Sequence, residues 1–500
     1  MAELPPLHRA EISGIPVLWS PCPGPMAGGI AFRVGRADES VPQGGITHLV
    51  EHLAMTGAED GPYDDCNAFV DAALTGFGAR GEPADVAAFV NRVTATLSDL
   101  PLDQVEASRR VLRVEAAGED GGVNGNLLAA RYGLRGFGVV GGRELGLGWL
   151  GPEQVAAYTA RYFTAGNAAL WFTGPPPAGL DPVLPAGQRQ PLPTAIPLPL
   201  RLPACLRDDS GEHDGEGGAA LSLLAPWAPA TVVGLDVLGR RAFKRLRADL
   251  GASYHVQAGV AEDVDAGTVH ALVTADALRD GVPKVRDGLL AVVTELATAG
   301  PTQEELDRST RDYQRSYANQ PELDGWVWYR AAEELYGRPF EQPAERAARL
   351  RALTPGDVAV VFERMRATAI MALPGYCSPP DGFTLLEPDG GGPVQGRTHK
   401  FALPFSRRRL VAAEEGLTLS DRDGRATVRF DDCVAVLTWR DGARVLIGHD
   451  GASILFAQEA FRRGAEVARL IWQRVPHDRW VPMDELEPSP LADGPGRPAL

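Results

Sequence analysis

Five consecutive residues, His48-Leu49-Val50-Glu51-His52, form the pattern H-x-x-E-H. In an α-helix, residues four positions apart lie on one face, and the residue at the third position lies beside them. His48 and His52 can therefore bind one metal ion, and Glu51 can reach a water molecule on that ion. Two imidazoles, an open coordination position and a carboxylate are what zinc-assisted hydrolysis requires. The pattern predicts a helix that carries a catalytic metal site.

The residues around this pattern indicate where the helix begins and ends. Gly44-Gly45 precede it, and we expect the helix to open at Ile46 and to stop near Gly57, a suitable C-cap. Apolar residues lie between and after the histidines: Leu49, Val50 and Leu53. The helix is therefore expected to be buried, and buried histidines need polar partners, for which a metal is suitable. A surface helix with two solvated histidines is the competing interpretation.

A catalytic zinc ion needs a third protein ligand. Residues 103–115 read as a second amphipathic helix, with four apolar positions at Val105, Val111, Leu112 and Val114. Glu115 lies at its C-terminal part and Glu119 follows one turn later. From the residues alone, either carboxylate can be the third ligand.

The chain resembles the pitrilysin/insulinase/mitochondrial-processing-peptidase family of inverzincin zinc peptidases. Residues 45–57 match that family's G-x-x-H-[FL]-x-E-H-[ML]-x-[FM]-x-G, and residues 109–115 are similar to its R-x-V-[VI]-x-x-E segment. In the family this second segment carries the third zinc ligand. The resemblance therefore favours Glu115 over Glu119.

A third matching segment lies far along the chain. Residues 246–254 resemble L-R-x-x-x-G-x-x-Y of the family's second domain type, which places Arg247 and Tyr254 at its Arg and Tyr positions. The resemblance implies that these two side chains bind the substrate backbone near the scissile carbonyl. Both groups are suited to stabilising a developing oxyanion.

Three departures from the family pattern bear on substrate binding and catalytic strength. The step from His52 to Glu115 is shorter than usual, and we expect the missing residues after Val93, in a trimmed helix. Gly78-Ala79 stands where the family often has Asn-Ala, on the strand that pairs with substrate. Ser108 replaces the usual extra Glu seven residues before the ligand.

An internal repeat predicts a duplicated α/β unit. Residues 150–156 echo residues 353–359, and residues 101–104 echo residues 301–304, at nearly the same offset. Each unit should close with a strand, at 168–172 and at 369–373, followed by a Pro/Gly break.

A chain of 500 residues is too long for one core. We expect an α+β fold with two homologous sheet-plus-helices domains, which form half of a peptidase clamshell, and a third, smaller domain. The predicted ranges are a zinc-binding domain at 1–185, a linker at 186–217, a second peptidase-like domain at 218–375, a linker at 376–400, a pleckstrin-homology-like domain at 401–478 and a disordered tail at 479–500.

The third domain is predicted from short apolar strands separated by Asp-Gly turns and followed by one helix at about 458–474. This arrangement resembles a pleckstrin-homology-like β-barrel with a C-terminal helix. Arg407-Arg408-Arg409 can contact phosphate or a membrane, although a solvated run of charges is favoured. Contact with a membrane or a protein through this domain is a further expectation.

Composition excludes several classes of function. The net charge of −16 disfavours nucleic acid as a partner. Five scattered cysteines without C-x-x-C spacing indicate a reducing compartment, which we expect to be the cytoplasm. Richness in Gly, Pro, Ala and Arg suggests a bacterial source. No apolar run of 18 residues and no basic-then-apolar start is found, so neither a membrane span nor a signal peptide is predicted.

Together these features predict a zinc-dependent endopeptidase with one Zn²⁺ per chain, held by His48, His52 and Glu115, and with Glu51 as the general base. The family resemblance implies that two half-size chains form a chamber around short unfolded peptides, and that Arg247 and Tyr254 act on the partner's zinc site. Processing or leader removal is one such role, and a homodimer and a heterodimer are both compatible. The alternatives are a non-catalytic partner subunit or scaffold of a heterodimer, and an adaptor that works through the C-terminal domain.

Overall fold

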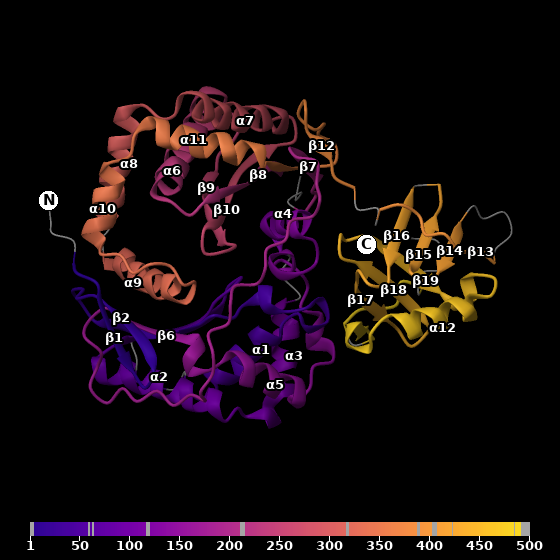
Figure 1. Cartoon of the computed structure of the whole chain (residues 1–500), viewed down its shortest axis with the longest axis horizontal. Coiled ribbons are helices and arrows are strands. Elements are labelled where there is room, and N and C mark those ends of the chain that lie inside the picture. Colours follow the sequence, from indigo (N-terminus) through magenta and orange to yellow (C-terminus); the bar gives the residue numbers. More distant parts are fainter. Residues whose placement is uncertain are drawn as a thin grey trace.

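The computed structural model shows the α+β fold that the sequence predicts (Figure 1). The described residues contain two six-stranded sheets, two four-stranded sheets and the helices that pack on them. The structure describes residues 5–58, 61–62, 65–116, 121–210, 216–316, 320–387, 391–402, 408–422, 424–484 and 486–491.

The first sheet has the strand order β1-β2-β6-β3-β5-β4. Its strands are β1 (His8–Ile12), β2 (Ile15–Trp19), β3 (Met26–Phe32), β4 (Asp65–Val70), β5 (Thr75–Gly81) and β6 (Ala168–Phe172). Helix α2 (Pro83–Ser98) packs on β3 and β5, and α1 (Ile46–Met55) lies against α2, α3 (Val105–Ala116) and α5 (Pro152–Tyr162). The apolar residues of these elements form one core, in which Leu49, Val50 and Leu53 of α1 are fully buried.

The second sheet repeats this arrangement, with the order β12-β7-β11-β8-β10-β9. Its strands are β7 (Ala204–Arg207), β8 (Glu216–Pro226), β9 (Val256–Asp263), β10 (Thr268–Leu278), β11 (Ile370–Leu373) and β12 (Thr384–Leu385). Its helices are α6 (Pro229–Phe243), α7 (Val282–Ala299), α8 (Gln303–Ser316), α10 (Pro343–Arg351) and α11 (Pro355–Ala367). The repeated sequence segments start α5 and α11 at equivalent prolines, and β6 and β11 are the predicted closing strands. The duplication inferred from the sequence is therefore present.

One helix of each sheet domain packs on the sheet of the other domain, and the two domains face each other (Figure 1). From the second domain, α9 (Gln320–Leu335) packs on the first sheet, where Ala331, Ala332 and Leu335 meet Ala31, Leu74 and Ala169. From the first domain, α4 (Gly122–Tyr132) packs on the second sheet. This exchange fixes the position of the two domains within one chain.

Arg131 of α4 makes buried hydrogen bonds across this interface. Arg131 is 1% exposed, and its guanidinium donates to the Ser222 hydroxyl at 2.7 Å, the Ser222 carbonyl at 3.1 Å and the Thr368 carbonyl at 2.9 Å. Burial lowers the pKa of Arg131 to about 10. An Arg131→Leu variant removes these buried hydrogen bonds, although the Ser222 hydroxyl keeps its bond to His270 Nε2. We therefore expect the variant to lose roughly 3 kcal/mol of stability. Thermal unfolding of this variant beside Arg135→Leu, at an exposed position three residues after the end of α4, tests the prediction; equal melting temperatures would contradict it.

Asn124 of α4 makes a second polar contact across this interface. Its Nδ2 donates to Oε1 of Glu262 in β9 at 3.2 Å. Burial raises the pKa of Glu262 to about 8, and the charges of Asp71 and Asp263 act in the same direction. A folded-state pKa above the unfolded value means that stability falls as the pH rises from about 4.5 to about 8. We expect Glu262→Gln to remove this dependence of stability on pH. The effect should be a few kcal/mol, because each tenfold change in proton affinity corresponds to about 1.4 kcal/mol. Urea unfolding of both proteins at pH 5 and pH 8.5 checks it, and parallel pH profiles would refute it.

The C-terminal region consists of two four-stranded sheets on a shared core, ordered β13-β14-β15-β16 and β19-β18-β17-β20. The predicted short strands correspond to β14 (Arg409–Ala413), β15 (Gly416–Ser420), β16 (Arg425–Arg429), β17 (Cys433–Thr438), β18 (Ala443–Gly448) and β19 (Ser453–Ala457). Helix α12 (Gly464–Arg474) starts later than predicted, because Gln458–Ala460 form a 3-10 turn. In the residues that the structure describes, these sheets do not close into the expected barrel.

Several predicted boundaries need correction. The linker at 186–217 contains β7, which pairs in parallel with β11, and the linker at 376–400 contains β12 and β13 (Arg397–Lys400). The tail predicted to be disordered from 479 contains β20 (Trp480–Pro482), which pairs with β17. Val481 and Met483 are fully buried there, so burial of apolar side chains orders this segment despite its polar composition.

Candidate metal centre

Helix α1 presents the H-x-x-E-H pattern with its N-terminus fixed by a buried carboxylate. It begins at Ile46, as predicted, after Gly45 in the left-handed conformation (φ 91°). The Glu39 carboxylate accepts hydrogen bonds from the backbone N–H groups of Gly45 and Thr47, both at 2.9 Å. Burial raises the pKa of Glu39 to about 7. Its two bonds satisfy donors that the first helical turn leaves without partners.

The two imidazoles lie on the accessible side of α1. The His48 side chain is 14% exposed and that of His52 is 30% exposed, while the apolar residues between them are buried. Their ring centroids are 4.9 Å apart at an interplanar angle of 81°. This face is therefore open to an ion and to a substrate.

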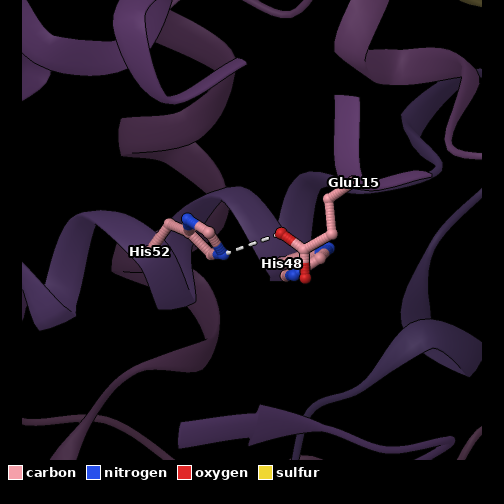
Figure 2. Close-up of side chains that lie close together, drawn as sticks. All are labelled: His48, His52 and Glu115. Atoms are coloured by element: carbon pink, nitrogen blue, oxygen red, sulfur yellow. Dashed lines mark ion pairs between the residues drawn. The ribbon is translucent and has the colours of Figure 1, made fainter. Parts of the chain in front are cut away.

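The third candidate ligand approaches from α3 (Figure 2). Glu115 Oε2 lies 3.7 Å from His52 Nε2, and ligand atoms of His48, His52 and Glu115 all lie within 4.8 Å of one another. Tetrahedral zinc with bonds of ~2.1 Å separates its ligand atoms by about 3.4 Å. A small closure of the group reaches this spacing, and two imidazoles with a carboxylate form a donor set that zinc accepts. Glu119 lies outside the described residues.

The buried face of α3 differs from the predicted one. Val105 and Leu112, seven residues apart, are buried, whereas Val111 is 58% exposed and Val114 is 79% exposed. Helical periodicity puts Val105 and Leu112 on one face and turns the other two valines away from it. Glu115 is nevertheless brought to the histidines, because its position on the helix faces α1.

Glu51 lies beside the candidate ligands. It is 7% exposed, and its Oε2 is 3.8 Å from His52 Nε2. The structure therefore brings together all four residues that the sequence assigned to the zinc half of the site: His48, Glu51, His52 and Glu115.

Glu144 is a member of the site that the sequence did not reveal. Its carboxylate lies 3.1 and 3.3 Å from His48 Nδ1, and Arg36 Nη2 lies 3.3 Å from the same group. Burial lowers the pKa of His48, but the bond and charge of Glu144, with the charges of Glu51 and Glu115, raise it above its ordinary value. A carboxylate on Nδ1 leaves Nε2 for a metal and orients the ring. At Ser108, where the family has its extra Glu, the chain offers no carboxylate.

The prediction that Gly78-Ala79 lie on the strand that pairs with substrate is wrong. Gly78 and Ala79 lie in β5, which is flanked by β3 and β4, so they are not at an edge. The edge strand next to β5 is β4, and it carries Asn67-Ala68, the pair that the family pattern contains. This pair stands eleven positions before Gly78-Ala79. Helix α2 also runs past Val93 to Ser98, so the prediction of a helix trimmed after Val93 is wrong.

Arg247 and Tyr254 lie together in the second domain. Arg247 belongs to a π-helical segment, Lys244–Asp249, and its Cζ is 4.5 Å from the centre of the Tyr254 ring, which is 73% exposed. Among the described contacts, neither residue bonds to His48, His52 or Glu115. Within one chain, the structure therefore does not bring this pair to the zinc half of the site.

No family model and no curated protein matches this sequence. Several solved structures are similar to this chain. A protease from Helicobacter pylori is 15% identical, with 74% of this chain and 100% of that chain covered and a TM-score of 0.60. The M16 peptidase inactive domain from Pseudomonas fluorescens is 14% identical, with 75% and 100% covered and a TM-score of 0.59. The chain has the fold of the M16 peptidases.

The M16 peptidases are the pitrilysin family that the motifs resemble, and identities this low show the fold alone. The first half of the periplasmic protease PqqL from Escherichia coli is a further match, 16% identical with a TM-score of 0.54, covering 73% of this chain and 91% of that chain. These matches cover about three quarters of the chain, and the pleckstrin-homology-like assignment stays a prediction. In the described residues, no helix is both long and apolar enough to span a bilayer.

Proposed function

We propose that this protein is a zinc-dependent endopeptidase that cleaves short unfolded peptides. The observation that carries the proposal is the convergence of His48, His52 and Glu115 from two helices, with ligand atoms within 4.8 Å of one another. Glu51 beside this group and Glu144 behind His48 complete a site suited to hydrolysis. The M16 peptidase fold supports the same class of reaction.

The chemistry follows from the residue types. When bound, zinc supplies a Lewis acid that lowers the pKa of water to about 7 and polarises a carbonyl. Glu51 accepts a proton from the water that attacks the scissile carbonyl and then donates it to the leaving amine nitrogen. Glu144 holds the His48 ring through Nδ1, which would leave its other nitrogen to bind the ion.

Strand β4 supplies a place for an extended peptide. It is the edge of the first sheet and lies against α1, so backbone groups of a peptide can pair with it next to the metal site. A cavity of about 280 Å³ lies beside this strand. Its lining includes Asn67, Phe69, Ala79, Trp171 and Trp328, and apolar side chains of a substrate fit such walls. We infer that β4 and this cavity select unfolded peptides.

The oxyanion-stabilising pair is proposed to act between two chains. Arg247 and Tyr254 stack on each other, and the tyrosine ring is exposed, which leaves it available to a second copy. In a two-fold dimer, the pair of each chain would serve the zinc site of the other. We propose a homodimer on this basis, with a heterodimer of similar half-size chains as the competing arrangement.

Mixing two inactive variants tests this arrangement. Glu51→Gln lacks the general base and Tyr254→Phe lacks the phenol, and each should be inactive alone. A hybrid dimer contains one site with an intact Glu51 and an intact Tyr254, so we expect the mixture to recover about a quarter of the wild-type turnover. A mixture as inactive as its components, with hybrid dimers shown by native mass spectrometry, would refute action between chains.

A non-catalytic partner subunit is the second candidate, because one of the similar solved structures is an M16 inactive domain. This candidate predicts zinc binding without turnover, or neither, until a catalytic partner chain is added. We further propose a bacterial cytoplasmic location, since Cys205, Cys377 and Cys433 form no disulfide and burial raises the pKa of the Cys205 and Cys433 thiols to about 11.

A further inference from the structure

A short turn separates the metal site from the C-terminal domain. This turn, η5 (Leu145–Gly148), directly follows Glu144 and contacts α1, α3 and the C-terminal strand β20. Both helices that carry candidate zinc ligands therefore touch the same segment, and so does the domain that lies beyond the M16-like part of the chain.

Polar contacts fix the turn to the two ligand-bearing helices. On the side of α1, Gly146 N–H donates to the Gly44 carbonyl at 2.9 Å, and Glu144 binds His48. On the side of α3, the Arg109 guanidinium, only 8% exposed, donates through Nε to the Leu147 carbonyl at 2.9 Å. Gly44 permits the approach, since a Cβ there would lie 2.7 Å from the Arg143 carbonyl oxygen.

Apolar contacts fix the other side of the turn to the C-terminal domain. Leu145 is buried in a cluster formed by residues of β17, β18, the turn between them and the segment after α12: Ala435, Leu437, Trp439, Ala443, Val445, Val481 and Met483. Leu486 lies against Gly148, where an added Cβ would meet its side chain at 2.8 Å. The segment before the turn is also bound, because Leu134 N–H donates to the His449 carbonyl at 2.7 Å.

We propose that Glu144 is a positioning residue for the metal ligand His48, and that the C-terminal domain holds it in place through η5. The domain thereby sets the metal affinity of the site. Glu144 belongs to a loop and not to a strand. The position of its carboxylate therefore depends on the packing of Leu145 and Leu486 between this loop and the C-terminal domain. The catalytic consequence of this inference rests on the proposed function. The effect of Glu144 on the His48 ring does not depend on that function.

Zinc affinity in a double-mutant cycle tests the proposal. Measured by competition with a chelator in the full chain, Glu144→Gln should lower zinc affinity about 10–100-fold. Leu486→Ala should lower it several-fold, and Leu470→Ala, which alters an equally half-buried leucine on α12, should leave it unchanged. The double variant with Glu144→Gln and Leu486→Ala should bind zinc as weakly as Glu144→Gln alone. Wild-type affinity in Leu486→Ala, or fully multiplicative losses in the double variant, would overturn the proposal.

A readout without metal separates this proposal from the proposed function. The Nδ1 proton of His48 can be followed by NMR in metal-free protein with labelled histidine. We expect slow exchange of this proton in the wild type and in Leu470→Ala, faster exchange in Leu486→Ala, and no such signal in Glu144→Gln. If the wild type binds no zinc, the peptidase proposal fails while this comparison still decides the role of Glu144. Equal exchange in Leu486→Ala and the wild type would refute the role of the C-terminal domain.

Discussion

Replacing Glu51 by Gln is expected to lower kcat/KM for an unstructured peptide by about two to four orders of magnitude, the usual contribution of a general base. The amide has nearly the shape of the carboxylate but cannot accept the proton of the attacking water. Glu51 is not one of the three candidate ligands, so zinc content should stay at the wild-type level. Cleavage of a peptide mixture, followed by mass spectrometry, and metal analysis of the same samples measure both quantities.

The matched control is Glu153→Gln, an exposed glutamate at the start of α5. It removes the same charge from the same domain and should retain full turnover and zinc. Undiminished cleavage by Glu51→Gln would exclude Glu51 as the base. A loss of zinc together with turnover would show that Glu51 acts by holding the ion.

Replacing Glu115 by Ala is expected to lower zinc affinity by more than the ~10–100-fold that accompanies the loss of an outer partner such as Glu144. The reason is that a catalytic zinc site uses three protein ligands, and Glu115 is the only one of the three that α3 supplies. Zinc competition with a chelator gives the affinity directly, and turnover should fall in parallel.

Glu119→Ala provides the comparison for Glu115, because the residues alone left both carboxylates open as ligands. We expect it to bind zinc like the wild type. Normal affinity in Glu115→Ala combined with weak binding in Glu119→Ala would reverse the assignment of the third ligand.

The parts of the site that sequence predicted are those set by local periodicity. His48, Glu51 and His52 occupy one helix, so their spacing determines their common face. Glu115 followed from a second helical pattern together with a family motif. Glu144 lies 96 residues from its histidine in an irregular, glycine-rich segment, and no periodic pattern links the two. Only tertiary packing brings that carboxylate to the site.

The wrong assignment of Gly78-Ala79 has a related cause. Counting from the motif assumes a fixed length for the connection between α1 and the edge strand, whereas here α1 ends at Met55 and β4 begins at Asp65. The hydrogen-bonded order of the strands, which a sequence does not state, identifies β4 and its Asn67-Ala68 as the edge.

The repeated unit and its closing strands were visible in the sequence because duplication leaves similar segments at a constant offset. The exchange of α4 and α9 between the domains was not visible, since both are ordinary amphipathic helices whose partners lie far away in the chain. Strands β7, β12 and β20 were missed for another reason: they are short, and pairing with a neighbouring strand orders them within Pro-rich or polar surroundings.

The most direct test of the central claim is to remove metal from the wild-type chain with a chelator and to titrate zinc back while following cleavage of an unstructured peptide. We predict no cleavage by the metal-free protein and full recovery at one zinc per chain, with no recovery in Glu51→Gln. Full cleavage without metal, or one bound zinc per chain with no cleavage by the dimer, would contradict a zinc-dependent peptidase.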